Sequence, residues 1–326
     1  MPHKTIAVVI PCYRVARSIL DVVRTLPVWV DAVYCVDDAC PEKSGQLICA
    51  EIRDPRVRVL FHERNQGVGG AMITGFKAAL AAGHGIIVKV DGDGQVDPGL
   101  LPRLLHPIVS GTADFSKGNR FYDLQALRQM PLARRIGNFG LTLLTKVASG
   151  HWHISDPTNG FVAIHHAALR MLNFEKLSRS YFFETSLLIQ LNIIRAVVTE
   201  VPMPARYGSE RSSLSVWRTL IGFPPKLVAG LLRRLMWRYF IYDTNAVTVL
   251  LFVGSLSLAG GAAFGFYRWH EGVIAGQVQT TGTVALALLP VIVGIQMLLQ
   301  AWLLDIVNMP AAPLASRIHD TWESNG

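Results

Sequence analysis

The feature that most constrains the fold of this sequence is an apolar run, residues 85–90, followed directly by the acidic loop, residues 91–95. A short apolar run rich in β-branched residues is typical of a buried strand, and Asp91 and Asp93, each followed by a glycine, are typical of a tight turn. Hard cations such as Mg²⁺ are usually held by one or two carboxylates together with substrate phosphates. Asp-Gly pairs are also common in solvated turns, so the loop by itself leaves that alternative open. The segment predicts a buried strand that ends at a candidate metal site.

Further β-branched runs occur in the first third of the chain, and segments with helical spacing separate them. The expected strands are residues 5–10, 32–36, 56–61 and 85–90, and the expected helices are residues 15–26, 44–53 and 71–82. Strands that alternate with helices of this length predict an α/β fold with a parallel sheet.

Polar residues follow the ends of these strands. Pro11 and Tyr13 follow the first expected strand, and Asp37 and Asp38 end the second. Because ligands of an open parallel sheet bind outside the carboxyl ends of its strands, these residues should converge with the acidic loop on one crevice. A carboxylate after the second strand suits hydrogen bonds from a ribose or a base. The pattern therefore predicts a nucleotide site.

A dinucleotide-dependent dehydrogenase is one alternative for such a site. That class carries a glycine-rich turn directly after the first strand. Here Pro11-Cys12-Tyr13-Arg14 occupies that place, and the glycine-rich segment, residues 67–70, follows the third strand instead. The spacing therefore disfavours a dehydrogenase.

The composition points to a membrane. Hydrophobic residues make up 51% of the chain and charged residues 17%, and the apolar excess lies mostly after residue 240. Residues 246–267 and 284–304 contain no charged side chain. As helices rising about 1.5 Å per residue, both are long enough to cross a hydrocarbon core of about 30 Å. The sequence predicts an integral membrane protein with two spans.

The net charge of +8 predicts the orientation of these spans. Residues 206–238 hold seven Lys or Arg and one acid, which accounts for +6 of the total. Basic residues gather on the cytoplasmic side of spans, so the α/β domain and the tail are expected in the cytoplasm, at a plasma or inner membrane. A basic segment directly before a span also favours an anionic membrane surface over nucleic acid.

Residues 224–240 predict a basic amphipathic helix. Leu227, Leu231 and Leu235 recur every four residues. The basic residues Lys226, Arg233, Arg234 and Arg238 gather roughly on another side. This pattern is typical of a helix at a membrane surface, and a helix packed on protein is the alternative. The expected parts are an α/β domain (1–215), a juxtamembrane segment (216–243), two spans (within 244–306) and a cytoplasmic tail (307–326).

Gln296 and Gln300 lie one helical turn apart in the second expected span. Polar side chains in a membrane helix often bond to another helix, so we expect a homo-oligomer.

Four ordered motifs of this sequence resemble those of glycosyltransferase family 2. They are Ile10-Pro11-Cys12-Tyr13, Val36-Asp37-Asp38, Asn65-Gln66-Gly67-Val68-Gly69-Gly70 and Asp91-Gly92-Asp93-Gly94-Gln95. The resemblance implies a GT-A fold, which is Rossmann-like with a mostly parallel sheet. The Asp-x-Asp-x-Gln form and the two C-terminal hydrophobic segments are similar to dolichol-phosphate mannose synthases and bacterial polyprenyl-phosphate glycosyltransferases.

The resemblance also implies roles for residues of a donor site. Asp91, Asp93 and Gln95 would bind Mg²⁺ or Mn²⁺ and the diphosphate of a UDP- or GDP-sugar, and Asp93 would be catalytic. The other implied donor-binding residues are Pro11, Tyr13, Asp37, Asp38, Asn65 and Gly70.

The acceptor side is implied by basic residues, which suit phosphate recognition. Arg120, in a Gly-Asn-Arg motif, and Arg134 would contact a lipid phosphate; for both, a solvated basic surface is the alternative. Arg206 and Arg211 lie in a loop that matches the family imperfectly, because Ser212-Ser213 stands where the family often has Ser-Lys. They are expected at the donor or acceptor phosphates, and a loop that touches only lipid headgroups is the alternative.

Two acidic residues complete the expected site. Asp156, in a loop that matches the family's Asp-x-x-x-Gly-Phe pattern, would line the sugar or acceptor pocket, and an Asx-turn is its alternative. Glu184 is a candidate general base, or a carboxylate placed only at a helix start. Arg120, Asp156 and Arg206 join Asp93 as the expected catalytic residues.

The acceptor decides whether a base is needed. A phosphomonoester has a second pKa near 6, so it is already an anionic nucleophile at neutral pH. A sugar hydroxyl needs a base within about 3 Å. We predict inverting, metal-dependent transfer to polyprenyl (undecaprenyl or dolichyl) phosphate at the cytoplasmic face. The alternatives are a glycan hydroxyl acceptor, with Glu184 or Asp156 essential, and a catalytically silent membrane scaffold.

Overall fold

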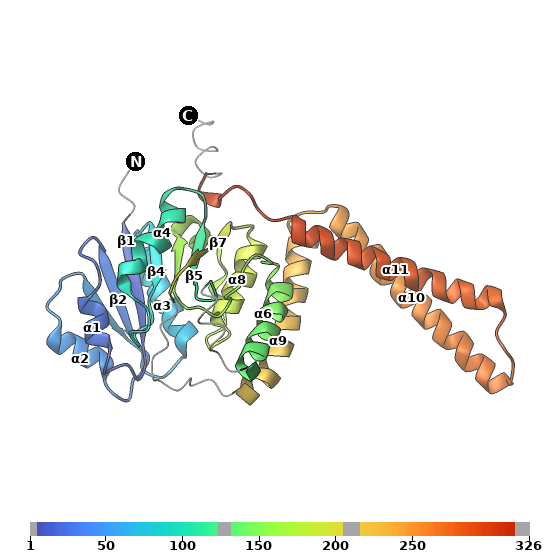
Figure 1. Cartoon of the computed structure of the whole chain (residues 1–326), viewed down its shortest axis with the longest axis horizontal. Helices are drawn as coiled ribbons and strands as arrows, with labels where there is room; N and C mark the ends of the chain where they lie inside the picture. The colour runs from blue at the N-terminus through green and yellow to red at the C-terminus, as the bar shows by residue number, and fades with distance from the viewer. Residues whose placement is uncertain (1–4, 123–131, 205–215, 317–326) are drawn as a thin grey trace. The chain divides into compact units, whose positions relative to one another are not determined.

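The computed structural model describes residues 5–122, 132–204 and 216–316 (Figure 1). Within these ranges, the side chains of residues 132–136, 138 and 216–221 are not described. The chain forms two compact units, one comprising Met1–Arg234 and Pro310–Gly326, the other Leu235–Met309. The first unit contains the α/β domain, and the second contains the two apolar helices.

The described part of the first unit is built on a seven-stranded sheet with the order β3-β2-β1-β4-β6-β5-β7. The strands are β1 (Ile6–Cys12), β2 (Ala32–Asp37), β3 (Val57–Phe61), β4 (Ile86–Lys89), β5 (Phe115–Asn119), β6 (Val162–His165) and β7 (Val198–Pro202). All neighbours pair in parallel except β6, which runs antiparallel to β4 and β5. The predicted mostly parallel α/β fold is confirmed.

Helices cover both faces of this sheet (Figure 1). The helices that precede the two apolar helices are α1 (Ile19–Arg24), α2 (Ser44–Glu51), α3 (Val68–Ala81), α4 (Leu101–Val109), α6 (Leu132–Ser149), α7 (His166–Met171), α8 (Phe183–Ile193) and α9 (Val216–Met236). Of these, α6 and α9 pack on α8. Successive residues of a strand point to opposite faces, so Ala7 and Val9 pack with α3 and α8, whereas Val8 and Ile10 pack with α1 and α4. Burial on both faces explains why the strands are almost continuously apolar.

The end of β1 differs from the sequence-based expectation. β1 continues through Pro11 to Cys12, although proline was expected to end it. β4 pairs with β1 only as far as Val9, so Pro11 has no paired residue on the β4 side of the strand. Such a position tolerates proline, which has no backbone N–H to donate. Lys117 and Asn119 lie inside β5, because β7 pairs with that strand as far as Asn119.

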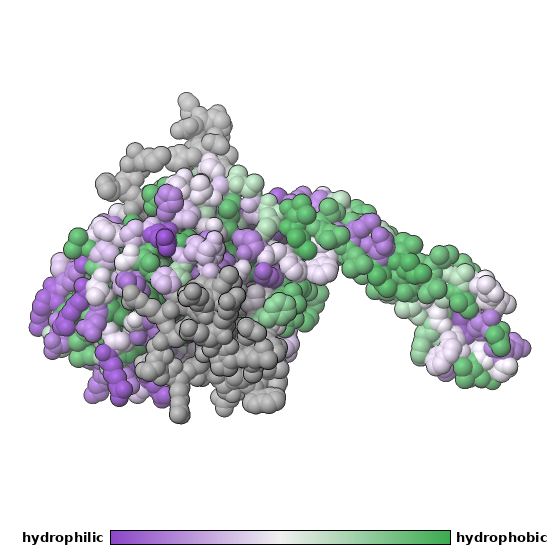
Figure 2. All heavy atoms as spheres, viewed as in Figure 1, coloured by the Kyte–Doolittle hydropathy of each residue, from purple (hydrophilic) through white to green (hydrophobic). Residues whose placement is uncertain are grey.

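The second unit is a hairpin of two long apolar helices, α10 (Ala246–Ala275) and α11 (Thr281–Val307). Both are long and apolar enough to cross a membrane, and few of their apolar residues are buried, unlike those of a soluble core helix. Figure 2 shows hydrophobic residues along this hairpin. Glycines bring the helices together: a Cβ on Gly294 would lie 2.6 Å from the backbone N of Leu258. Small residues allow this close packing of helices in membranes.

The segment before the hairpin differs from the expected basic surface helix. The apolar stripe of α9 packs on protein, since Leu227 lies in a cluster with Ala148 of α6 and Ile189 of α8. Arg234 is buried and donates to the carbonyl oxygens of Val147 and Ala148, at the end of α6. The expectation that the four cations of this segment share one exposed surface is wrong for Arg234.

Arg238 is also buried, and it donates to the carbonyl oxygen of Asn308. The expectation of an exposed cation is therefore wrong for this residue too, because its guanidinium is buried and bonds to a backbone carbonyl oxygen. Lys226 is exposed on α9, as expected, and Arg233 is partly exposed, but the apolar side chains of Val228 and Leu232 are exposed as well.

The chain returns to the α/β domain after α11. Leu314 is 7% exposed and joins the core cluster of the first unit. The backbone N–H groups of Leu314 and Ala315 donate to the carboxylate of Asp114, which also accepts from Val197 N–H at 2.8 Å. Residues 310–316 of the expected tail are thus part of the first unit. Both ends of the hairpin therefore lead to the same unit.

Replacing Leu314 by Ala is expected to destabilise the α/β domain by about 2–4 kcal/mol, since a buried leucine is truncated. The midpoint of thermal unfolding in detergent should fall, and residues 310–316 should become accessible to protease. Leu232→Ala is the matched control, because Leu232 is 61% exposed. Equal unfolding midpoints and cleavage patterns for the two variants would contradict a stabilising role for Leu314.

Candidate active site

Most of the expected site residues that the structure describes gather at one edge of the sheet. The carboxyl ends of β1, β2 and β4 share this edge, and Cys12 lies opposite Asp37 in the register. β6 starts at the same edge because it runs antiparallel, and Val162 lies between Lys89 of β4 and Lys117 of β5. The strand order therefore brings the acidic loop and the loop before β6 to one edge.

The acidic loop begins beside a buried cation that the sequence reasoning missed. Lys89, the last residue of β4, is 1% exposed. Its Nζ lies 2.6 Å from Oδ1 of Asp91 and 3.2 Å from Oε1 of Glu184. Burial opposes the charge of Lys89, but the two carboxylates outweigh burial and raise its pKa above the ordinary value. The only signal in the sequence was a lone lysine within an apolar strand.

The rest of the acidic loop is fixed by short contacts. The backbone N–H of Gln95 donates to Oδ1 of Asp93 at 3.0 Å. Ser18, just before α1, donates its hydroxyl to the carbonyl oxygen of Gly92 at 2.7 Å. Gly94 has a φ of 75°, a left-handed conformation that favours glycine. The loop is therefore held against α1 by its backbone, and Asp91 remains one-third exposed.

This donor set fits a hard divalent cation that shares its coordination with a ligand. Asp91 and Asp93 offer carboxylate oxygens, and Gln95 offers an amide oxygen. Among the described residues, no three His, Cys, Asp or Glu side chains form a ready-made metal cage. Mg²⁺ is typically bound by one or two carboxylates plus substrate phosphates. The fit is therefore to a cation completed by phosphate oxygens.

The two aspartates expected at the nucleoside organise the surrounding backbone. Asp37 accepts from the N–H groups of Cys40 and Gly45, at 2.8 and 2.6 Å. Asp38 accepts from the N–H groups of Gln66 and Gly67, both at 2.8 Å. Both aspartates are nearly fully buried. The structure assigns them the shaping of the donor loops, and their contact with a nucleoside stays a prediction.

The remaining donor residues lie around these loops. Tyr13 directly follows β1 and is 42% exposed. The Asn65 side chain bonds to the Asp38 carbonyl oxygen, and its own carbonyl accepts from Gly67 N–H. Gly70 lies in the first turn of α3, against the backbone of Arg179. Tyr13 and Asn65 are thus placed at the edge where Asp38 holds the glycine-rich segment.

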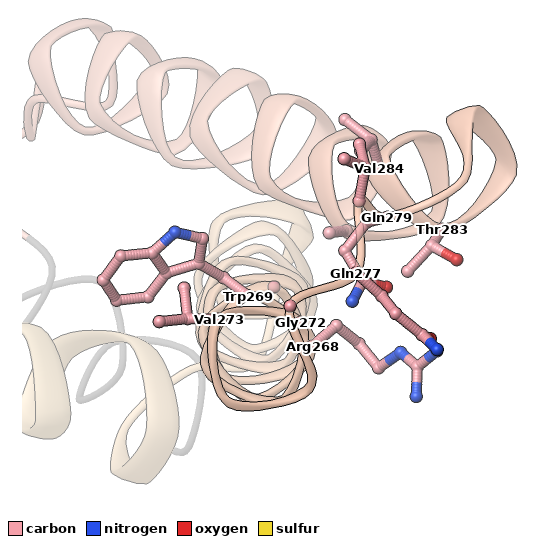
Figure 3. Close-up of a pocket in the computed structure, with 12 residues that line it drawn as sticks. Arg268, Trp269, Gly272, Val273, Gln277, Gln279, Thr283 and Val284 are labelled. Carbon is pink, nitrogen blue, oxygen red and sulfur yellow. The ribbon is translucent and has the colours of Figure 1, made fainter.

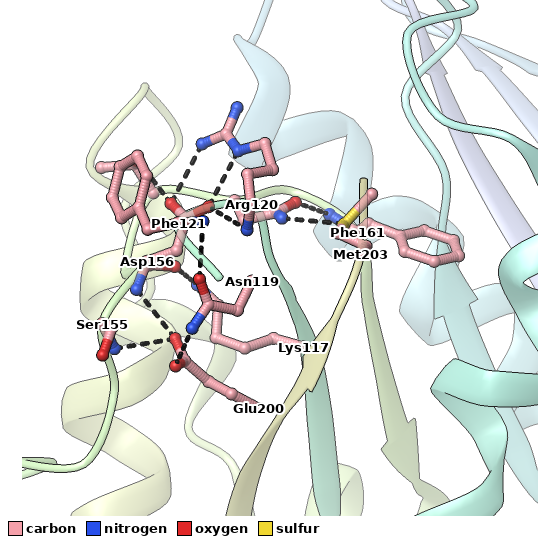
Figure 4. A network of polar contacts seen from close by, with 11 residues as sticks. Lys117, Asn119, Arg120, Phe121, Ser155, Asp156, Phe161, Glu200 and Met203 are labelled. Carbon is pink, nitrogen blue, oxygen red and sulfur yellow. Dashed lines mark hydrogen bonds and ion pairs between the residues drawn. The ribbon is translucent and has the colours of Figure 1, made fainter. Parts of the chain in front are cut away.

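Arg120 and Asp156 form an ion pair at the other half of this edge (Figure 4). Nε of Arg120 lies 2.8 Å from Oδ2 of Asp156, and Nη2 lies 3.0 Å from Oδ1, which is a bidentate geometry. Asp156 is 0% exposed, whereas the Arg120 side chain is 33% exposed. Burial raises the pKa of Asp156, but the bonds from Arg120 outweigh burial and lower it overall.

A second group of residues missed by the sequence reasoning supports this pair. Glu200 of β7 accepts from the N–H groups of Ser155 and Asp156, both at 2.8 Å, and from the Asn119 amide (Figure 4). Lys117 donates to the Asp156 carbonyl oxygen at 2.6 Å. Burial lowers the pKa of Lys117 to about 8 despite these carboxylates. Glu200 and Lys117 therefore fix the loop that carries Asp156.

Gly160 joins the two halves of the site. A Cβ on Gly160 would lie 2.3 Å from Oδ2 of Asp91 and 2.3 Å from Nζ of Lys89. The loop before β6 therefore contacts the acidic loop directly. Any side chain at position 160 would displace Asp91 and Lys89.

Three expected phosphate contacts cannot be placed. Arg206 and Arg211 lie outside the described residues. Arg134 lies in the first turn of α6, but its side chain is outside the description. Glu184 lies in the first turn of α8, is 15% exposed and is paired with Lys89.

A separate cavity of about 580 Å³ lies in the second unit, near the turn of the α10–α11 hairpin (Figure 3). Its lining includes Arg268, Trp269, Gln277 and Gln279. None of the candidate site residues lines it, so it is not the site at the sheet edge.

A model of glycosyl transferase family 2 matches residues 7–173, which are 167 of the 326 residues. This match spans β1, the acidic loop, Arg120 and Asp156. The chain belongs to glycosyltransferase family 2. The family 2 glycosyltransferase is therefore an enzyme whose α/β domain has the GT-A fold, as predicted.

The names of several relatives of this glycosyltransferase refer to a polyprenol or a polyprenyl phosphate. A UDP-N-acetylglucosamine–dolichyl-phosphate N-acetylglucosaminyltransferase of Methanococcus voltae is 29% identical, over 68% of this chain and 94% of its own length. An undecaprenyl-phosphate mannosyltransferase of Micrococcus luteus is 31% identical, over 52% of this chain and 70% of its own. A polyprenol monophosphomannose synthase of Mycolicibacterium smegmatis is 28% identical, over 62% and 77%.

Solved structures support the fold. Glucosyl-3-phosphoglycerate synthase of Mycobacterium tuberculosis, in complex with UDP, superposes with a TM-score of 0.54 at 19% identity, over 71% of this chain and 80% of its own. The same enzyme with Mn²⁺, UDP and phosphoglyceric acid gives 0.53 at 20% identity, over 74% and 81%. At these identities the likeness supports the GT-A fold alone.

Proposed function

We propose that this enzyme transfers a sugar, with inversion, from a UDP- or GDP-sugar to a polyprenyl phosphate at the cytoplasmic face of a membrane. The observation that carries this proposal is the way in which the charged side chains at the sheet edge are paired. Both carboxylates considered for a hydroxyl acceptor are paired, Glu184 with buried Lys89 and Asp156 with Arg120, and Arg120 is partly exposed. An acceptor that is already an anion suits this arrangement.

The donor half is proposed to bind the nucleotide. Asp91, Asp93 and Gln95 would hold Mg²⁺ or Mn²⁺, which would neutralise charge on the departing nucleoside diphosphate. Tyr13 and Asn65, beside the loops shaped by Asp37 and Asp38, are proposed to contact the nucleoside. The UDP in the name of the Methanococcus voltae relative supports a UDP-sugar.

The acceptor half is proposed to bind the lipid phosphate through Arg120, with Arg134, Arg206 and Arg211 as further contacts. A phosphomonoester is largely ionised at neutral pH and attacks without a base. Catalysis then consists of positioning two anions that repel each other, the donor and the acceptor, and of stabilising the negative charge of the departing nucleoside diphosphate. Asp156 fixes Arg120 for this task through its bidentate pair. The names of three relatives support a polyprenyl phosphate acceptor.

The hairpin of α10 and α11 is proposed to span the membrane with both ends in the cytoplasm. The basic residues before α10 support this orientation. Gln296 and Gln300 are exposed on α11, and the described residues include no hydrogen-bond partner for either side chain. Since an unpaired amide is costly in hydrocarbon, we propose that a second copy of the chain pairs with them.

The deciding experiment measures nucleoside diphosphate release by the purified enzyme. A panel of UDP- and GDP-sugars is tested with Mg²⁺ or Mn²⁺, with and without undecaprenyl phosphate. Release that requires the lipid phosphate would support the proposal and identify the donor. Release that is independent of lipid phosphate would favour a glycan hydroxyl acceptor, and no release with any donor would favour a silent scaffold.

Glu184→Gln is expected to lower turnover by less than about 10-fold at saturating metal, because a phosphate acceptor needs no general base. The rate is measured as lipid-dependent release of nucleoside diphosphate. Glu175→Gln, on the exposed segment before α8, is the matched control. A loss of 10³-fold or more in Glu184→Gln alone would instead identify Glu184 as the base for a hydroxyl acceptor.

A further inference from the structure

The mechanism proposed above leaves one buried charge unexplained, the ammonium of Lys89. It lies between two carboxylates from distant parts of the chain, Asp91 at 2.6 Å and Glu184 at 3.2 Å. The backbone of Gly160 closes the remaining side, since a Cβ there would lie 2.3 Å from Nζ. At 1% exposure, Lys89 cannot touch a substrate. Any role in catalysis must therefore be exerted through Asp91 or Glu184.

We propose that Lys89 is an internal counter-ion that weakens cation binding at the acidic loop until a nucleoside diphosphate is present. The inference rests on the donor-site part of the proposed function. It makes Lys89 a positioning residue that sets the order of binding, with metal and nucleotide entering together.

Four charged side chains lie in or beside the acidic loop. Asp91, Asp93 and Glu184 carry three negative charges, and Lys89 compensates for one of them. A divalent cation that approaches Asp91 meets an ammonium held by the same carboxylate, and like charges a few ångströms apart repel strongly away from bulk water. A bound diphosphate adds negative charge and oxygen ligands, which offset this repulsion.

Glu184 gives the ammonium a second partner. When a cation binds to the Asp91 carboxylate, Lys89 keeps its ion pair with Glu184 and is not left as an unpaired buried charge. Such a charge would cost several kcal/mol. Glu184 therefore makes Asp91 available to the cation, although it need not touch the cation itself.

The test measures binding of Mn²⁺ alone to the full-length protein in detergent, from the electron paramagnetic resonance signal of free Mn²⁺, with and without UDP. In Lys89→Met, Mn²⁺ without UDP should bind roughly 10- to 100-fold more tightly than in the wild type, because a nearby positive charge is removed. The gain in affinity on adding UDP should shrink accordingly.

Glu184→Gln should act in the opposite direction. With its second partner neutral, Lys89 should hold Asp91 more strongly, and Mn²⁺ without UDP should bind about 3- to 10-fold more weakly. This variant removes no buried cation, so it also tests the proposal if Lys89→Met does not fold.

Lys77→Met is the control, because Lys77 is an exposed lysine of α3 outside the acidic loop. Its Mn²⁺ affinity should equal that of the wild type. Equal affinities in all variants, or no Mn²⁺ binding with UDP in any of them, would overturn the counter-ion role. The assay contains neither sugar nor lipid, so a wrong acceptor assignment would leave its outcome unchanged.

Discussion

Asp93→Asn is expected to reduce lipid-dependent nucleoside diphosphate release by at least about 10³-fold, which corresponds to roughly 4 kcal/mol of transition-state stabilisation. The change removes a negative charge from the proposed metal site. It retains a carbonyl oxygen that can accept from Gln95 N–H, so the loop should keep its shape. Circular dichroism and gel filtration in detergent should therefore match the wild type.

Asp97→Asn is the control for this loss. Asp97 lies in the same segment and accepts from Gly99 N–H at 2.8 Å, a capping bond that asparagine also makes. Its turnover should stay close to that of the wild type. A near-normal rate of Asp93→Asn, with metal chelated, would show that the acidic loop is not a metal site.

Arg120→Ala is expected to have the second largest effect, acting on both activity and stability. It would remove the proposed acceptor contact and lower lipid-dependent turnover by roughly 10²-fold or more. It would also leave the fully buried Asp156 carboxylate without its bidentate partner, at a cost of about 3–5 kcal/mol. Turnover is measured by nucleoside diphosphate release, and stability by thermal unfolding in detergent.

Arg120→Lys separates the two effects. Lysine retains the charge that compensates Asp156 but cannot reproduce a bidentate bond. We expect it to recover part of the stability while the KM for polyprenyl phosphate stays raised and the KM for the donor changes little. Arg103→Lys, at an exposed arginine of α4, should change neither constant. A selective rise in the donor KM would place Arg120 at the nucleotide instead.

Much of the fold followed from local patterns. The strands through β4 and the helices between them were expected from β-branched runs and helical spacing, and most of their boundaries differ by a few residues. The uncharged stretches also lie within α10 and α11 as expected. These patterns are readable because burial on a strand or helix repeats at a fixed period along the chain.

The contacts of the site residues were harder to predict from the sequence. Asp156 was expected to line a pocket, yet its side chain is paired with Arg120. Arg234 was expected at a surface, yet it is buried at the end of α6. In each case the partner lies far away in the sequence, and residue type alone does not identify it.

The sequence by itself determined the family, the alternating α/β pattern, the order of the motifs and the two long apolar helices. Each of these depends on residues close together in the chain. Only the tertiary structure decided which polar groups meet: Lys89 with Glu184, the Asn119 amide with Glu200 across 81 positions, and the Leu314 backbone N–H with Asp114 across 200. For Asn119 and Glu200 the physical reason is the strand order, in which β5 and β7 are parallel neighbours although about 80 residues separate them. Such pairings have no period along the chain.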